Sequence, residues 1–347
     1  MTLPVRAAVV ACADLKECDD GLAMTGFLAR RLANYVLLCL AATFLAFALA
    51  SVTFSPLGQL QGRNPPPPAS VIEAKRAELR LDEPVAARFV SWMGGVVQGD
   101  FGSTITGQPI TDELGRRIGV SLRLFTLGTV LGIAVGVLVG VASAIRQYRP
   151  SDYAATLFSF LVLSTPVFLI GTLLKFGGLQ LNGAAGTTVL YFTGEFSPGF
   201  DGSGWAALGD RLSHLVLPTL AIALGQIAYY SRYQRSAMLD VLGSDFLRTA
   251  QAKGLTRRRA LFKHGLRTAL IPMATLFAFG IGLLIVGGVF TERIFGWYGM
   301  GDWFVYGVQQ NDTNIVATVT LFVAVLVLFS GWLSDVLYAA LDPRIRI

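Results

Sequence analysis

Histidine and cysteine, which commonly bind metal ions or act in catalysis, are scarce in this sequence. The only histidines are His214 and His264, and the three cysteines, Cys12, Cys18 and Cys39, show no repeated C-x-x-C spacing. Zinc sites and disulfide frameworks need Cys and His in regular patterns. The sequence also has no G-x-x-x-x-G-K-[ST] phosphate loop and no paired carboxylates within one apolar run. We therefore expect no ATP hydrolysis, no metal site and no hydrolytic site in this chain.

A few polar groups interrupt or follow the apolar runs. Ser164, Thr165 and Pro166 lie near the middle of one run, Gln226 lies in another, and Glu292 directly follows a third. A proline inside such a run frees a backbone carbonyl that a neighbouring helix or a water-lined cavity can satisfy. These five residues are our candidates for a translocation pathway. A simple kink and an interhelical hydrogen bond are the alternatives for the first four.

The segment Ser244–Gly265 is too polar to enter a bilayer and has the composition of two short helices. Ser244 can cap a helix that Gly254 ends, and Thr256 can cap a second, basic helix. A short helix, a glycine and a basic helix suit docking into the groove of a partner protein. A surface hairpin attracted to anionic lipid is the alternative, and the residues alone do not decide between the two.

The rest of the chain is dominated by apolar segments. Hydrophobic residues make up 53% of the 347 and charged residues 14%. A helix that crosses the hydrocarbon core needs about 20 mostly apolar residues. Six segments qualify: Leu32–Phe54, Leu124–Ile145, Tyr153–Leu174, Leu212–Ser231, Thr268–Thr291 and Thr313–Ser334, the last continuing towards Leu341. The sequence therefore predicts an all-α membrane protein with six transmembrane helices.

The basic residues predict the orientation of these helices. With the N-terminus inside, the loops that carry most Lys and Arg all become cytoplasmic, including 232–267, and only Arg211 and Arg293 remain in short outer loops. We therefore expect both termini in the cytoplasm of a multi-pass protein of the cell membrane. The formal charge of +6 is then explained by topology, and a nucleic-acid partner is not required.

The predicted second helix carries a regular row of glycines. Gly128, Gly132, Gly136 and Gly140 follow one another at a spacing of four, so they lie on one face of the helix. Such a face lets another helix approach closely. Glycine is also common in membrane helices, but the regular register favours a packing face.

These elements divide the chain into five parts. Residues 1–23 form an N-terminal extension that we expect to be disordered, 24–54 hold the first helix, and 342–347 form a cytoplasmic tail. Residues 55–117 form an outer cap, in which we expect a helix over Val71–Leu81 and another after Pro84 with Phe89 and Trp92 on its apolar face. Residues 118–341 hold helices two to six and the cytoplasmic loop 232–267.

Several motifs occur in an order typical of one transporter family. The stretch FLRTAQAKGLTRRRALFKHGLRTALIP resembles the cytoplasmic EAA-type loop of the permeases of dipeptide and oligopeptide ABC importers, with Arg248-Thr249-Ala250 in place of Glu-Ala-Ala. LDEPVAARFVSWMGGVVQGDFGSTI, LSTPVFLIG, HLVLPTLAIALGQIAYYSRYQRSAML and SDVLYAALDPRIRI are similar to further segments of that family. The resemblance covers nearly everything from Met24 onward and is nearest to the oligopeptide-permease B-type subunit.

The resemblance implies a type I ABC importer permease fold with an outer cap between helices 1 and 2. It also implies a coupling helix that inserts into the ATPase. Its residues are Phe246, Leu247, Arg248, Thr249, Ala250, Gln251, Ala252, Lys253, Gly254 and Leu255.

The same resemblance implies the partners. They are a second homologous permease subunit, two ATPase subunits that hold ATP and Mg, an extracytoplasmic substrate-binding protein, a peptide substrate and membrane lipid. No cofactor is expected in this chain itself. The alternatives are the permease of a nickel or metal-chelate ABC importer, whose motifs are shared, and an ion-coupled secondary transporter. A secondary transporter needs buried carboxylates or broken helices near the midplane, and the sequence has almost none.

Overall fold

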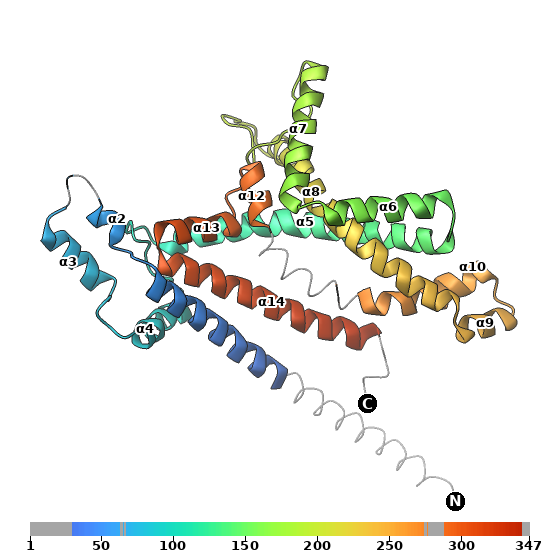
Figure 1. The fold of residues 1–347 in the computed structure, drawn as a ribbon, viewed down its shortest axis with the longest axis horizontal. Helices are drawn as coiled ribbons and strands as arrows, with labels where there is room; N and C mark the ends of the chain where they lie inside the picture. The colour runs from blue at the N-terminus through green and yellow to red at the C-terminus, as the bar shows by residue number, and fades with distance from the viewer. Residues whose placement is uncertain (1–29, 63–64, 66, 274–275, 277–287, 342–347) are drawn as a thin grey trace, which may run out of the picture.

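The computed structural model describes residues 30–62, 65, 67–273, 276 and 288–341. The predicted extension 1–23, the tail 342–347 and most of the predicted helix Thr268–Thr291 lie outside these residues. Within the described part, every regular element is a helix, and one isolated bridge joins Ser103 to Pro109. The all-α class is therefore confirmed. Figure 1 shows an elongated molecule in which α5 runs along the long axis.

Five helices of the described part are long and apolar enough to cross a membrane. They are Arg30–Thr53, α5 (Ile110–Ile145), α7 (Val167–Ala185), α8 (Trp205–Leu242) and Thr313–Ser334 of α14 (Thr313–Leu341). Two of them are much longer than the apolar runs that predicted them. The helix that was expected after residue 117 begins at Ile110, where Asp112 and Glu113 in the first turn favour a helix N-terminus.

The predicted third span is not one helix. It divides into α6 (Pro150–Ser164) and α7, with Thr165 in an extended conformation between them. Pro166 explains the break, because a residue before proline is disfavoured in the helical region. Figure 1 shows α7 turning away from the direction of α6. The prediction of a single helix over Tyr153–Leu174 was therefore wrong.

The segment between the first span and α5 contains α2 (Gly58–Gln61), α3 (Ala69–Glu78) and α4 (Val85–Val97). The predicted apolar face of α4 is confirmed, since Phe89 and Trp92 pack on Phe47 of the first helix. In Figure 1, α3 and α4 lie at one end of the molecule, and α9 and α10 lie at the other.

Two short helices, α12 (Val289–Phe295) and α13 (Met300–Gln310), precede α14 in the chain. Helix α12 packs against α7, α8 and α13, whereas α13 lies near the N-terminal end of α5, where a buried cluster joins three helices. Its members are Ile110 and Leu114 of α5, Met300 and Trp303 of α13, and Ile315 and Val319 of α14.

Candidate functional site

The four glycines of α5 lie against α8. A Cβ atom placed on Gly128 would come within 2.7 Å of the Ile222 side chain, and one on Gly132 would lie 2.6 Å from Cβ of Gln226. Real Cβ atoms do not approach other atoms this closely, so only glycine fits at this separation of the helices.

The same contact continues towards the C-terminal ends of both helices. Gly136 faces Tyr230, and a Cβ on Gly140 would lie 2.5 Å from the carbonyl oxygen of Ser231. The contacts advance by four residues on both helices together, so α5 and α8 run parallel. We call these four glycines and the α8 residues that they face the glycine seam. It makes α5 and α8 one closely packed unit.

The polar segment after α8 folds into α9 (Asp245–Ala252), α10 (Arg257–Ala260) and a π-helical turn, η1 (Leu261–Gly265). Gly254 follows α9 with φ +91°, a conformation that glycine adopts without steric cost. The Thr256 hydroxyl accepts a hydrogen bond from the backbone N–H of Arg259 at 3.3 Å. The predicted roles of Gly254 as a terminator and of Thr256 as an N-cap are confirmed.

Two neighbouring residues of α9 have opposite environments. The side chain of Leu247 is only 2% exposed, in a buried cluster with Val141 of α5, Val241 of α8 and Leu261 of η1. Phe246 is 43% exposed. The remaining predicted coupling residues are exposed (Arg248, Thr249, Ala252, Lys253, Gly254) or half-buried (Ala250, Gln251, Leu255). Together α9, α10 and η1 form a hairpin, which is seated on the α5–α8 unit through Leu247 and leaves the ring of Phe246 exposed.

The structure places the predicted pathway residues in two different settings. The hydroxyls of Ser164 and Thr165 both donate to the carbonyl of Leu161, at 3.0 and 2.7 Å, so they satisfy backbone freed by the break at Pro166. Gln226 lies half-buried in the glycine seam. These hydrogen bonds and contacts stabilise helices. They do not bring Ser164, Thr165, Pro166 and Gln226 together around one cavity.

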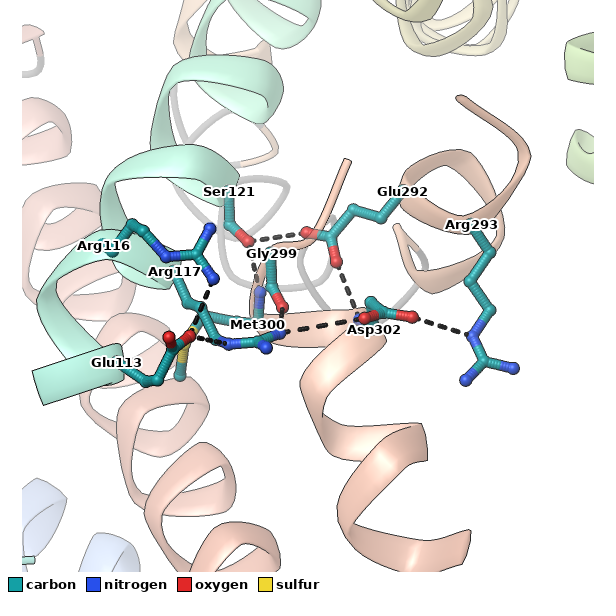
Figure 2. Close-up of polar contacts among 9 residues, drawn as sticks. All are labelled: Glu113, Arg116, Arg117, Ser121, Glu292, Arg293, Gly299, Met300 and Asp302. Carbon is teal, nitrogen blue, oxygen red and sulfur yellow. Dashed lines mark hydrogen bonds and ion pairs between the residues drawn. The ribbon is translucent and has the colours of Figure 1, made fainter. Parts of the chain in front are cut away.

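Glu292 lies in a polar cluster at the N-terminal end of α13 (Figure 2). Its side chain is fully buried. One carboxylate oxygen accepts a hydrogen bond from the Ser121 hydroxyl at 2.6 Å, and the other accepts one from the backbone N–H of Asp302 at 2.8 Å. The Ser121 oxygen in turn accepts a bond from the N–H of Met300 at 2.8 Å. The buried carboxyl group of Glu292 therefore lies at the positive end of the α13 helix dipole.

Charged side chains surround this cluster on its exposed side. Asp302 lies 3.2 Å from Nε of Arg293 and 3.7 Å from a terminal nitrogen of Arg117, and Arg117 also binds Glu113 at 2.8 Å. Burial raises the pKa of Glu292 to about 7, against the lowering effect of its hydrogen bonds to Ser121 and the backbone. Sequence reasoning named Glu292 but missed Ser121, because nothing in the sequence links two residues so far apart in the chain.

Residues 132–347 match the family model described as the inner membrane component of binding-protein-dependent transport systems. The chain belongs to this permease family. It is a multi-pass membrane protein and a transport component rather than an enzyme, and permeases of this family work with ATPase and binding-protein partners.

Named relatives of the permease extend the match to most of the chain. The oligopeptide transport system permease protein OppB of Mycobacterium tuberculosis is 59% identical over 93% of this chain and all of its own length. AppB of Bacillus subtilis, also named an oligopeptide permease, is 38% identical over 77% of this chain and 82% of its own. The dipeptide permease protein DppB of Escherichia coli is 32% identical over 78% and 84%.

Proposed function

We propose that this permease forms half of the translocation pathway of an ATP-driven peptide importer. The other half is a second, homologous permease subunit, two ATPase subunits bind ATP and Mg, and an extracytoplasmic binding protein delivers the peptide. The cargo is inferred from the relatives, which are named as oligopeptide and dipeptide permeases. The chain itself needs no cofactor for this role.

The seating of α9 is the observation that carries the proposal. Leu247 fixes the hairpin to the ends of α5 and α8, and Phe246 is left exposed on it. Exposed apolar groups on a short helix suit insertion into a groove of another protein. We infer that Phe246–Leu255 binds an ATPase subunit and that closure of the ATPase dimer moves α5 and α8 with it. Alternating access to the pathway follows as a shift between inward-open and outward-open states.

The orientation supports the same proposal. The parallel course of α5 and α8 requires one crossing of the membrane between them, which α6 and α7 provide. With both termini in the cytoplasm, α9 lies on the cytoplasmic side, where ATP is available. The segment that holds α3 and α4 then lies outside, on the side of the binding protein.

The test is reconstitution of the permease in proteoliposomes with a second permease subunit, ATPase subunits and a binding protein from the same organism. ATP inside and binding protein outside should support uptake of labelled short peptides, and the permease alone should hydrolyse no ATP. Uptake of nickel chelates without uptake of peptides would contradict the proposed cargo. ATP hydrolysis by the purified permease alone would contradict the assignment of the energy source to partner subunits.

A further inference from the structure

One buried carboxylate joins three segments of the permease at the C-terminal ends of α5 and α8. Asp152, in the first turn of α6, is 2% exposed. Arg235 of α8 binds both of its oxygens, with Nε at 2.7 Å and a terminal nitrogen at 2.8 Å. The Ser143 hydroxyl of α5 donates to the same carboxylate, and so does the backbone N–H of Tyr148 at 3.0 Å. We call Asp152 and Arg235 the α6–α8 clasp.

The environment of the clasp makes it a specific connection. A carboxylate buried away from water is stable only when charged and polar hydrogen-bond donors replace the water molecules. Here the donors come from α5, α8 and the segment before α6. The hydrogen bonds from Arg235, followed by those from Ser143 and Tyr148, hold the pKa of Asp152 well below its usual range. The carboxylate therefore stays ionised at neutral pH, and the planar guanidinium fixes its direction as well as its distance.

The clasp lies close, along α8, to the hairpin formed by α9, α10 and η1 (residues 245–265), which we call the coupling hairpin. Arg235 is about two turns before the end of α8 at Leu242. In the last turn, Val241 belongs to the buried cluster that holds Leu247 of α9. A displacement of α9 therefore acts on the part of α8 that carries Arg235.

The attachment of α6 differs from that of α5. The glycine seam packs α5 on α8 along four turns, whereas α6 is held to α8 by polar contacts near the same end. Besides the clasp, the hydroxyls of Ser159 and Ser231 lie 3.1 Å apart, and the guanidinium of Arg232 lies 3.9 Å from the ring centre of Phe160. Beyond these contacts, α6 ends at the Thr165–Pro166 break and leads into α7.

We propose that Asp152 and Arg235 are positioning residues for energy coupling: the clasp fixes α6 to α8, so that movement of the coupling hairpin is transmitted to α6 and α7. This inference rests on the proposed function, because it assumes that ATPase subunits move the hairpin. It adds the residues that carry the movement from the α5–α8 unit to the third span. Without the clasp, the ATPases can still bind the hairpin and hydrolyse ATP, but α6 no longer follows α8.

The test uses the complete reconstituted importer with Asp152→Asn and with Arg235→Gln. Both variants should retain the ATPase subunits and hydrolyse ATP at a rate within about twofold of the wild type. Peptide uptake per ATP hydrolysed should fall about tenfold or more. Arg235→Lys retains the charge but cannot form the bidentate pair, so it should give an intermediate value of peptide uptake per ATP hydrolysed. Arg123→Gln is the matched control, because Arg123 pairs with Glu195 at 3.0 Å but is half exposed, and its ratio should equal that of the wild type.

A second measurement distinguishes a loss of movement transmission between α8 and α6 from a loss of folding. Spin labels at Leu157 of α6 and Tyr233 of α8, both exposed, should keep one narrow distance distribution in the wild type with and without trapped nucleotide. In Asp152→Asn the distribution should broaden when nucleotide is trapped. An unchanged uptake-to-hydrolysis ratio in both variants would overturn the proposal, and so would a parallel loss of uptake and hydrolysis. If Arg235→Gln does not assemble, a wild-type ratio in Arg235→Lys together with a narrow distribution in Asp152→Asn would overturn it. Absence of peptide uptake by the wild-type importer would instead refute the proposed function.

Discussion

Ser121 and Glu292 meet in a hydrogen bond of 2.6 Å, although 171 positions separate them in the sequence. The bond ties α5 to α12. The same carboxylate binds the N–H of Asp302, so it also fixes the direction of α13. Gly299 lies beside it, and a Cβ atom there would collide with both Ser121 and Glu292. The cluster therefore makes the N-terminal part of α5, α12 and the start of α13 one rigid junction.

This junction should make the stability of the permease depend on pH. The pKa of Glu292 is raised from 4.5 to about 7 by burial. Below pH 4.5 the group is protonated in both the folded and the unfolded state, and it contributes nothing. Between pH 4.5 and about pH 7, Glu292 is protonated in the folded state and ionised in the unfolded state. The unfolding free energy therefore falls as pH rises through this range. The full penalty, roughly 3 kcal/mol, is reached above pH 7.

Thermal unfolding of the detergent-purified permease between pH 5 and 8 measures this effect. The wild type should lose stability across the range, and Glu292→Gln should show a smaller slope because it has no titrating group. Glu73→Gln, at an exposed position of α3, should keep the wild-type slope. Equal slopes for the wild type and Glu292→Gln would show that Glu292 does not titrate in this range.

The glycine seam should tolerate no added methyl group. Gly140→Ala would bring a Cβ atom to 2.5 Å from the backbone carbonyl of Ser231, and rigid backbone cannot yield as a flexible side chain can. We expect a loss of about 1–3 kcal/mol in unfolding free energy, the usual effect of overpacking. The measurement is the midpoint of thermal or denaturant unfolding in detergent.

Gly119→Ala is the control for this substitution, because Gly119 lies on the same helix and no atom lies within 4 Å of the added Cβ. It should be neutral or stabilising by up to about 1 kcal/mol, since alanine favours helix more than glycine does. Equal effects of the two substitutions would mean that the seam is looser than the contacts indicate.

The sequence predicted the elements of this fold better than their contacts. Apolar length predicted four of the long apolar helices in the described part, because a helix must be apolar over its whole length to cross hydrocarbon. It could not show that α5 begins at Ile110 or that α8 continues to Leu242, since those turns are polar. The spacing of the glycines predicted a packing face, but nothing in the spacing names α8 as its partner.

Some parts of the candidate functional site could be predicted from the sequence, and others could not. Gly254 and Thr256 could be assigned because caps and terminators act within a few residues of sequence. The seat of Leu247 and the partners of Glu292 could not be assigned, because they depend on contacts between distant helices. The proline at 166 indicated an interruption, but the length of the apolar run argued for a single helix.

Gly254 should be required for the geometry of the hairpin. Its φ of +91° is strained for any residue with a Cβ atom, most of all a β-branched one, although the surrounding space is open. We expect Gly254→Val to shift the hairpin and to reduce ATPase binding or peptide uptake per ATP hydrolysed. The measurements are co-purification of the ATPase subunits and the uptake-to-hydrolysis ratio.

Gly243→Ala serves as the control for Gly254→Val. Gly243 also adjoins α9, but its φ of −84° suits any residue and its nearest neighbour would be 3.7 Å away. It should retain ATPase binding and coupling. Wild-type assembly and transport in Gly254→Val would show that the turn after α9 has no part in coupling.

Phe246 and Leu247 should have separable roles, although they adjoin in the chain. Leu247→Ala removes a buried side chain from the cluster with Val241 and Leu261, so we expect a loss of about 2–5 kcal/mol in the stability of the hairpin. Phe246→Ala removes a ring that is 43% exposed, so the isolated permease should be nearly unaffected. Its binding to the ATPase should weaken at least tenfold, because the exposed ring is the largest apolar group on α9 available to a partner.

Limited proteolysis of the hairpin and titration with purified ATPase distinguish these roles. Leu247→Ala should be cleaved faster than the wild type in the free permease, whereas Phe246→Ala should be cleaved at the wild-type rate and fail only in the titration. If Phe246→Ala bound the ATPase with wild-type affinity, the contact with the partner would have to lie elsewhere on the hairpin. Exposed basic residues such as Arg258 of α10 and Lys263 of η1 would then be the next positions to substitute.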